Sequence, residues 1–164
     1  MIATKPPSAS PPALNPKVIL PFINSARSVM STMLGVETVI GRPNVKVLPG
    51  PAYDCSGIVS FSGDVVGVVI VSFPKQAAMK FIEAFAGSPV VVDSPDFIDA
   101  LGELTNMIAG GAKKDLGAAA NISVPTVIIG SGHIVAGPSN VPCLCVPCTT
   151  TLGEFEIDIC VKQL

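Results

Sequence analysis

Residues 94–114 read SPDFIDALGELTNMIAGGAKK, and this stretch combines a helix start with two chemically different faces. Ser94 is a natural N-cap and Pro95 fits the first helical position, so the stretch predicts a helix that runs to Lys114 or beyond. Its apolar residues recur on one face of that helix, which can bury against a sheet. They are Phe97, Leu101, Leu104, Ile108 and Ala112.

The opposite face of the predicted helix carries a polar stripe. Four residues fall within about 60° of one another at 100° per residue: Asp99, Glu103, Asn106 and Gly110. Most polar stripes are only solvated, but Gly102, Gly110 and Gly111 each cost about 1 kcal/mol relative to Ala in a helix. Their concentration therefore indicates close packing or docking. Glu103 and Asn106 lie one turn apart, where a carboxylate and a carboxamide can act together on a partner.

Outward from this helix, the chain alternates between helix and strand signals. A first helix is predicted from Pro16 to the residue before Gly35, and a second from Pro74 to the residue before Gly87. Strand-like segments lie near residues 37–40, 53–61, 65–72, 124–129, 143–151 and 155–161, and those at 53–61 and 65–72 predict an antiparallel hairpin. The order predicts an α/β fold of the α+β type, with helices packed on a mostly antiparallel sheet.

Length and composition limit the classes of function. The 164 residues suffice for one compact domain, which we place at residues 15–164 after a flexible, proline-rich leader at residues 1–14. A net charge of -2 argues against nucleic acid or an anionic membrane as partner. No apolar run reaches the roughly 18 residues needed to cross a bilayer, and the N-terminus lacks the apolar core of a signal peptide. We therefore expect a cytoplasmic protein, and its apolar content of 49% makes a homo-oligomer plausible.

The five cysteines are predicted to be reduced thiols, because no secretion signal precedes them. A possible metal site would use Cys143, Cys145 and Cys148 as ligands, with Cys55 or Cys160 as the fourth. Their spacing is poor for zinc, and Cys143 and Cys145 would point to the same face of a strand, where small cysteines commonly fill a core. We therefore predict no metal ligands.

Two further motifs are weaker candidates for chemistry. His133 is the only histidine, so it lacks a second imidazole for zinc, and a Cys–His nucleophile pair has no surrounding signature. We expect it to be a solvated turn residue. The run from Gly110 to Lys114 lacks the spacing of a phosphate-binding loop, and its two lysines favour the C-terminal half of the helix electrostatically.

The run Asp99-Ala-Leu-Gly-Glu103-Leu-Thr-Asn106 resembles the signature of the CheC, CheX and FliY family of bacterial chemotaxis phosphatases. That signature is Asp or Ser, three residues, Glu, two residues, then Asn, on one helix. The resemblance extends to Gly35, the Gly41-Arg42-Pro43 segment, the glycine-rich hairpin and the strand start at Val124-Pro125-Thr126.

Within this family, CheC carries two such helices and CheX carries one competent copy. The first helix here has Asn24, but Pro21 occupies the place where Glu would be required. The chain therefore resembles CheX most. Family members place a proline farther downstream of the Asn than Pro125 stands here, which predicts a shorter intervening loop.

The resemblance implies a CheC-like fold and a protein phosphatase that removes the aspartyl phosphate of a CheY-like receiver domain. It implies Glu103 and Asn106 as catalytic residues, with Asp99, Gly102 and Gly110 contacting the partner. It also implies a homodimer with no cofactor of its own, since Mg²⁺ would belong to the receiver. The alternatives are a non-catalytic CheC-like adaptor that binds a receiver or flagellar switch component, and a structural role.

Overall fold

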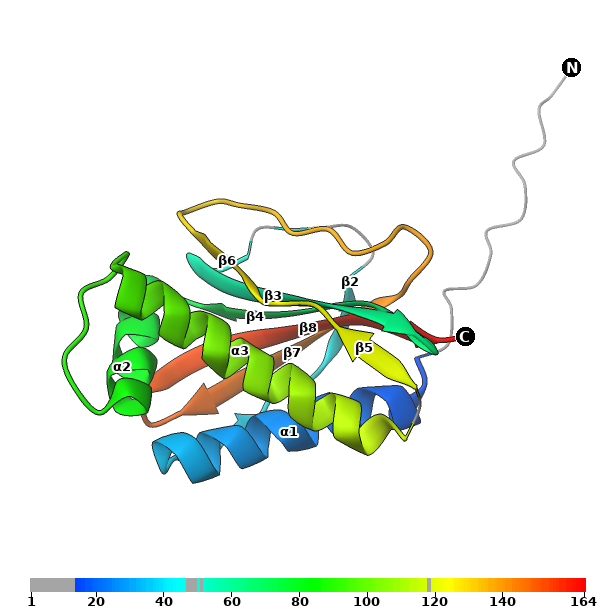
Figure 1. The fold of residues 1–164 in the computed structure, drawn as a ribbon, viewed down its shortest axis with the longest axis horizontal. Coiled ribbons are helices and arrows are strands. Elements are labelled where there is room, and N and C mark those ends of the chain that lie inside the picture. Colours follow the sequence, from blue (N-terminus) through cyan, green and yellow to red (C-terminus); the bar gives the residue numbers. More distant parts are fainter. Residues whose placement is uncertain (1–13, 47–49, 51, 118) are drawn as a thin grey trace, which may run out of the picture.

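The structure is a computed structural model that describes residues 14–46, 50, 52–117 and 119–164. Within these residues, helices cover one face of an eight-stranded antiparallel sheet (Figure 1). The predicted leader lies outside the described residues except for Leu14, which packs against the core. The predicted fold of helices on an antiparallel sheet is confirmed.

The helices are α1 (Pro16–Leu34), α2 (Lys75–Ala86) and α3 (Pro95–Leu116). Each ends at a glycine in the left-handed conformation, at Gly35, Gly87 and Gly117. The Ser94 hydroxyl accepts a hydrogen bond from the Phe97 amide at 3.2 Å, which confirms the predicted N-cap of α3. None of the helices in the described ranges is both long and apolar enough to span a membrane.

The strands are β1 (Val39–Ile40), β2 (Asn44–Lys46), β3 (Cys55–Gly63), β4 (Val65–Phe73), β5 (Ala120–Ile122), β6 (Thr126–Ile129), β7 (Cys143–Thr150) and β8 (Gly153–Gln163). The sheet order is β1-β7-β8-β4-β3-β5, with β2 also paired to β7 and β6 also paired to β3. The predicted hairpin of β3 and β4 is confirmed, with Ile58 opposite Ile70. Strands β2 and β5 were not predicted, because three residues are too few to show an alternating pattern.

The core lies between the sheet and the helices. All five predicted apolar residues of α3 are fully buried. Alternate residues of β3, β4, β7 and β8 meet them, which is the period expected of strands with one face on the core. At one end, Phe73 stacks on Phe155 with ring centroids 5.5 Å apart, and Phe81 packs against both.

One prediction about the cysteines is wrong. Cys143 and Cys160 form a disulfide, whereas Cys55, Cys145 and Cys148 are free and buried. The bond follows from the pairing of β7 with β8, in which Leu144 lies opposite Ile159 and the flanking cysteines therefore face each other. Sequence spacing does not reveal strand register, so this pair could not be found from the cysteine pattern alone.

Candidate functional site

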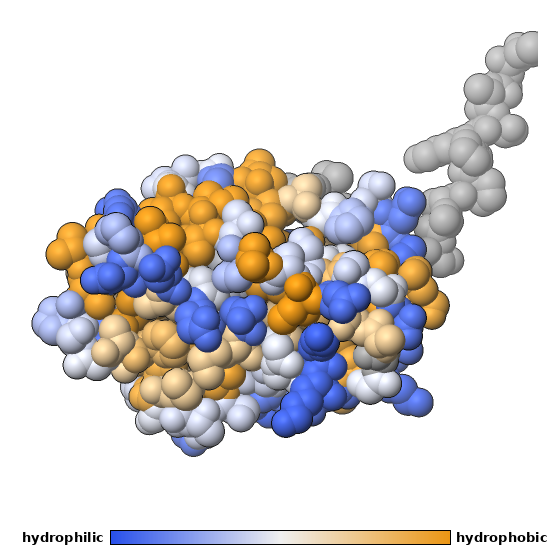
Figure 2. Space-filling view, in the orientation of Figure 1, coloured by the Kyte–Doolittle hydropathy of each residue, from blue (hydrophilic) through white to orange (hydrophobic). Residues whose placement is uncertain are grey.

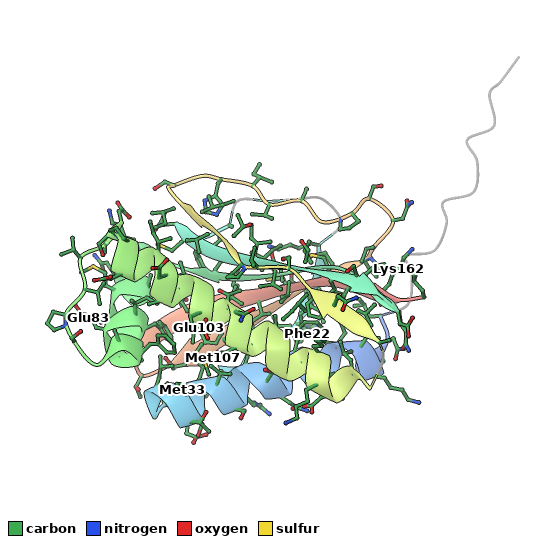
Figure 3. The ribbon with its side chains drawn as sticks, in the orientation of Figure 1. Phe22, Met33, Glu83, Glu103, Met107 and Lys162 are labelled. Carbon is green, nitrogen blue, oxygen red and sulfur yellow. A yellow bond between two sulfur atoms is a disulfide. The ribbon has the colours of Figure 1, made fainter. Side chains whose placement is uncertain are left out.

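The predicted polar stripe lies on the side of α3 that faces away from the sheet. Asp99 and Glu103 are exposed, and Asn106 and Gly110 are partly exposed. Figure 3 shows Glu103 projecting from α3 one turn before Met107, over the middle of the helix layer. The carboxylate of Glu103 and the carboxamide of Asn106 are thus presented together on one accessible surface.

Neither of these two side chains is engaged within the described part of the chain. The only salt bridge in the described part joins Lys46 of β2 to Asp158 of β8, so it involves no residue of α3. The side-chain hydrogen bonds found among the described residues likewise leave out Glu103 and Asn106. Both groups therefore keep their hydrogen-bonding capacity for a partner molecule.

A shallow hollow borders the stripe. It is lined by Ile98, Asp99, Gly102, Glu103, Pro125 and Val127. Gly102 lies beside the stripe and, unlike the stripe residues, is buried, and a Cβ atom there would lie 3.4 Å from Cγ of Pro125. Its small size therefore lets α3 approach the segment before β6, and the hollow beside Glu103 combines apolar walls with two carboxylates.

The height of α3 above the sheet is set at Gly57 of β3. A Cβ atom at Gly57 would lie 2.8 Å from Cβ of Thr105, closer than real Cβ atoms approach other atoms. Thr105 is fully buried, and its hydroxyl donates to the Leu101 carbonyl at 2.9 Å. Because Thr105 directly precedes Asn106, the contact at Gly57 fixes the position of the candidate site.

Helix α1 holds α3 from the side, and the two helices run antiparallel (Figure 1). The buried Ser25 hydroxyl donates to the Ile108 carbonyl at 2.7 Å. Gly111 lies against Ser25, and a Cβ atom at Gly111 would lie 3.1 Å from that of Ser25. In contrast, a Cβ atom at Gly110 would meet nothing within 4 Å.

Helix α1 does not repeat the Glu–Asn pair. Asn24 is exposed, but Pro21 is buried inside the helix at the place where a second Glu would stand. The first helix therefore supplies support for α3 and offers no second copy of the candidate site.

The other sequence candidates lie apart from this site. His133 is half-buried and not a solvated turn residue: its Nδ1–H donates to the Gly130 carbonyl at 2.7 Å, and its Nε2 lies 2.8 Å from the Ser56 hydroxyl. Ser56 in turn lies 2.9 Å from the hydroxyl of Ser72. These bonds fasten the loop after β6 to the sheet, a role that the turn context did not indicate.

The three clustered cysteines do not meet as one group. Cys148 packs into the helix-facing core, whereas Cys143 is bonded to Cys160. Cys145 is buried outside that core, near Glu156 and Asp158. Cys145 therefore belongs to a different group of side chains from the one that the Cys143–Cys148 spacing suggested.

Known proteins resemble this chain in sequence and in structure. The family model described as chemotaxis phosphatase CheX matches residues 55–149, which include all of α3. The CheY-P phosphatase CheX of Thermotoga maritima is 26% identical over 121 residues, which cover 71% of this chain and 78% of that protein.

Two solved structures share the fold. The chemotaxis protein CheX from Desulfovibrio desulfuricans superposes with a TM-score of 0.81 at 32% identity, covering 89% of this chain and 99% of that one. The CheX–CheY–BeF3–Mg²⁺ complex from Borrelia burgdorferi gives a TM-score of 0.73 at 25% identity, covering 89% and 98%. The chain therefore belongs to the CheX family of chemotaxis phosphatases.

Proposed function

We propose that this chain is a phosphatase that removes the aspartyl phosphate from a CheY-like receiver domain. Family membership supports this activity, as does the likeness to a CheX that is crystallised with CheY. The observation that carries the proposal is the pair Glu103 and Asn106, side by side on the outer face of α3 with no partner among the described residues.

The phosphatase has to supply few groups for this reaction. A receiver supplies the phosphorylated aspartate, a bound divalent cation and a lysine, so hydrolysis lacks chiefly a water molecule held in line with the phosphorus. In the reaction, the oxygen of that water bonds to phosphorus while the bond from phosphorus to the aspartate oxygen breaks. The products are inorganic phosphate and the free carboxylate.

Asn106 is the residue proposed to position the water. A carboxamide oxygen can accept a hydrogen bond from the water, while its NH₂ group donates to a neighbouring acceptor and fixes the amide plane. Positioning of this kind can lower a barrier by several kcal/mol without a covalent intermediate. Asn106 is partly exposed, so the water can reach it when a receiver docks.

Glu103 is proposed to hold the receiver in register. Its exposed carboxylate would pair with the receiver's lysine, in a charge-assisted hydrogen bond that is stronger than a neutral one. Asp99, one turn earlier, would orient the same partner. Gly102 and Gly110 would leave room for its backbone, Gly102 by bordering the hollow and Gly110 by its open surroundings.

The proposal places Mg²⁺ on the receiver and assigns this chain no cofactor for the reaction. It also includes a cytoplasmic homodimer. Large apolar side chains on the surface support an association of copies, and Figure 2 shows such side chains gathered above α3, over β6 and the loop after it. Val124 and Ile134 are 84% and 58% exposed.

Phosphate release from a purified, phosphorylated receiver tests the proposal. With the chain at one tenth of the receiver concentration, a phosphatase will turn over repeatedly and clear all of the phosphoryl receiver. Binding of the receiver without faster loss of phosphate would instead identify an adaptor, and would overturn the proposed activity.

A further inference from the structure

A thiol and two carboxylates meet on the face of the sheet that is turned away from the helices. One ligand atom each from Cys145, Glu156 and Asp158 lies within 4.8 Å of the other two. Strand register explains the cluster: Cys145 of β7 lies directly opposite Asp158 of β8. Glu156 precedes Asp158 by two residues, so it points to the same side of the sheet.

The carboxylate of Asp158 gives independent evidence for a ligand at this cluster, because one of its oxygens is buried and unpaired in the described part of the chain. The residue is 7% exposed, and Nζ of Lys46 donates to its Oδ2 at 2.6 Å. Its other oxygen, Oδ1, is buried and has no hydrogen-bond partner among the described residues. A buried carboxylate oxygen is normally satisfied by a donor or a cation, so this oxygen is available to coordinate a cation.

The charges of the cluster match a divalent cation. A thiolate and two carboxylates carry three negative charges, and Lys46 supplies one positive charge. The net charge of the group is then -2, which a divalent cation would balance. Binding of such a cation would displace the thiol proton of Cys145, because a thiol that coordinates a metal is deprotonated.

We propose that Cys145, Glu156 and Asp158 bind a thiophilic divalent cation of the zinc class. A thiolate ligand selects zinc over Mg²⁺ or Ca²⁺, which prefer oxygen ligands alone. Asp158 contributes Oδ1, because Lys46 holds Oδ2. Three protein ligands leave the fourth tetrahedral position for water. Glu156 is partly exposed, so the cation can reach the site from solvent on that side.

The site is separate from the proposed phosphatase surface. Its residues lie on the second face of the sheet, whereas Glu103 and Asn106 lie on the helix layer that covers the first face. Loss of the cation site therefore leaves receiver dephosphorylation unchanged. The two proposals can fail independently of each other.

Titration of the full chain with Co²⁺ tests the site, because a thiolate bound to Co²⁺ gives a charge-transfer absorption band. The chain is used with the Cys143–Cys160 disulfide intact, so these two sulfurs cannot ligate the metal. We expect one Co²⁺ per chain, a thiolate band, and its displacement by Zn²⁺. A chain that shows no such band at stoichiometric Co²⁺ overturns the proposal.

Two variants assign the band to its residues. Cys145→Ala should abolish it, whereas Cys148→Ala, which removes a buried thiol from the same strand on the core side, should keep it. A band that survives Cys145→Ala contradicts the assignment. If Cys145→Ala does not fold, Glu156→Gln replaces it, with Co²⁺ binding weakened at least tenfold as the expected result and unchanged binding as the contrary one.

Discussion

Gly57 lies directly against Thr105, at a distance that only a residue without a side chain permits: a Cβ atom at Gly57 would lie 2.8 Å from Cβ of Thr105. Strand β3 therefore supports α3 immediately before Asn106. The candidate site is exposed, but the contact that positions it is fully buried.

Gly57→Ala should destabilise the protein, because the new methyl group overlaps the Thr105 side chain. Overpacking of this kind costs about 1–3 kcal/mol. Chemical denaturation will measure the free energy of unfolding. Thr105→Ala in the same chain removes the overlapping hydroxyl and methyl groups and should recover part of the loss. A Gly57→Ala protein as stable as the wild type would show that α3 does not rest on this contact.

Gly110 and Gly111 should respond in opposite ways to alanine. Gly110→Ala should raise the free energy of unfolding by about 1 kcal/mol, since alanine favours the helix and its Cβ atom meets nothing within 4 Å. Gly111→Ala should lower it, because the added methyl group would press on Ser25 and its hydrogen bond to Ile108. Thermal unfolding of both variants provides the comparison. Equal effects would contradict the different packing of the two glycines.

Glu103→Gln should weaken receiver binding, because the proposed pair with the receiver's lysine loses its charge. Loss of one such pair corresponds to about tenfold or more in Kd. The titration uses a receiver loaded with BeF3 and Mg²⁺. Asp115→Asn is the matched control, since Asp115 is an exposed carboxylate on the same helix three turns further on. Equal weakening by both changes would indicate a general effect of charge and no specific pair.

Thiol counting tests the cysteine assignment. Burial raises the pKa of Cys55 to about 11 and those of Cys145 and Cys148 to about 12, so the reactive thiolate is scarce at neutral pH. Alkylation of the folded protein should therefore be slow. After unfolding without reductant, three thiols should react, and reduction should add two. Five reactive thiols before reduction would contradict the disulfide and would restore the predicted reduced state.

Local signals predicted α3 well. Its start at Ser94, its buried face and its polar stripe depend on residues within a few turns of one another, which capping and helical periodicity describe directly. Strands β2 and β5 could not be predicted in the same way. They consist of three residues each and exist because β7 and β3 offer them open edges.

The sequence could not predict the different surroundings of the three glycines of α3. Gly102, Gly110 and Gly111 carry the same helix penalty, and sequence alone treated them as one indication of packing or docking. The structure gives them different surroundings: Gly102 packs near Pro125, Gly111 against Ser25, and Gly110 against nothing. The partners come from distant parts of the chain, so only the tertiary structure separates the three.

The disulfide and the Cys145 cluster were missed for a related reason. Both depend on the register of β7 against β8, which places Cys143 next to Cys160 and Cys145 opposite Asp158. A shift of one residue would turn these side chains to the other face of the sheet. Register is set by the hydrophobic pattern of both strands together, and the spacing of cysteines within one strand does not contain it.

The rate of receiver dephosphorylation by Asn106→Ala, compared with Asn24→Ala, tests the central claim most directly. Asn24 is an exposed asparagine on α1, so its removal controls for the loss of a surface amide. We predict that Asn106→Ala lowers the rate on the order of a hundredfold with an unchanged free energy of unfolding, while Asn24→Ala keeps the wild-type rate. A folded Asn106→Ala protein with the wild-type rate would contradict the account.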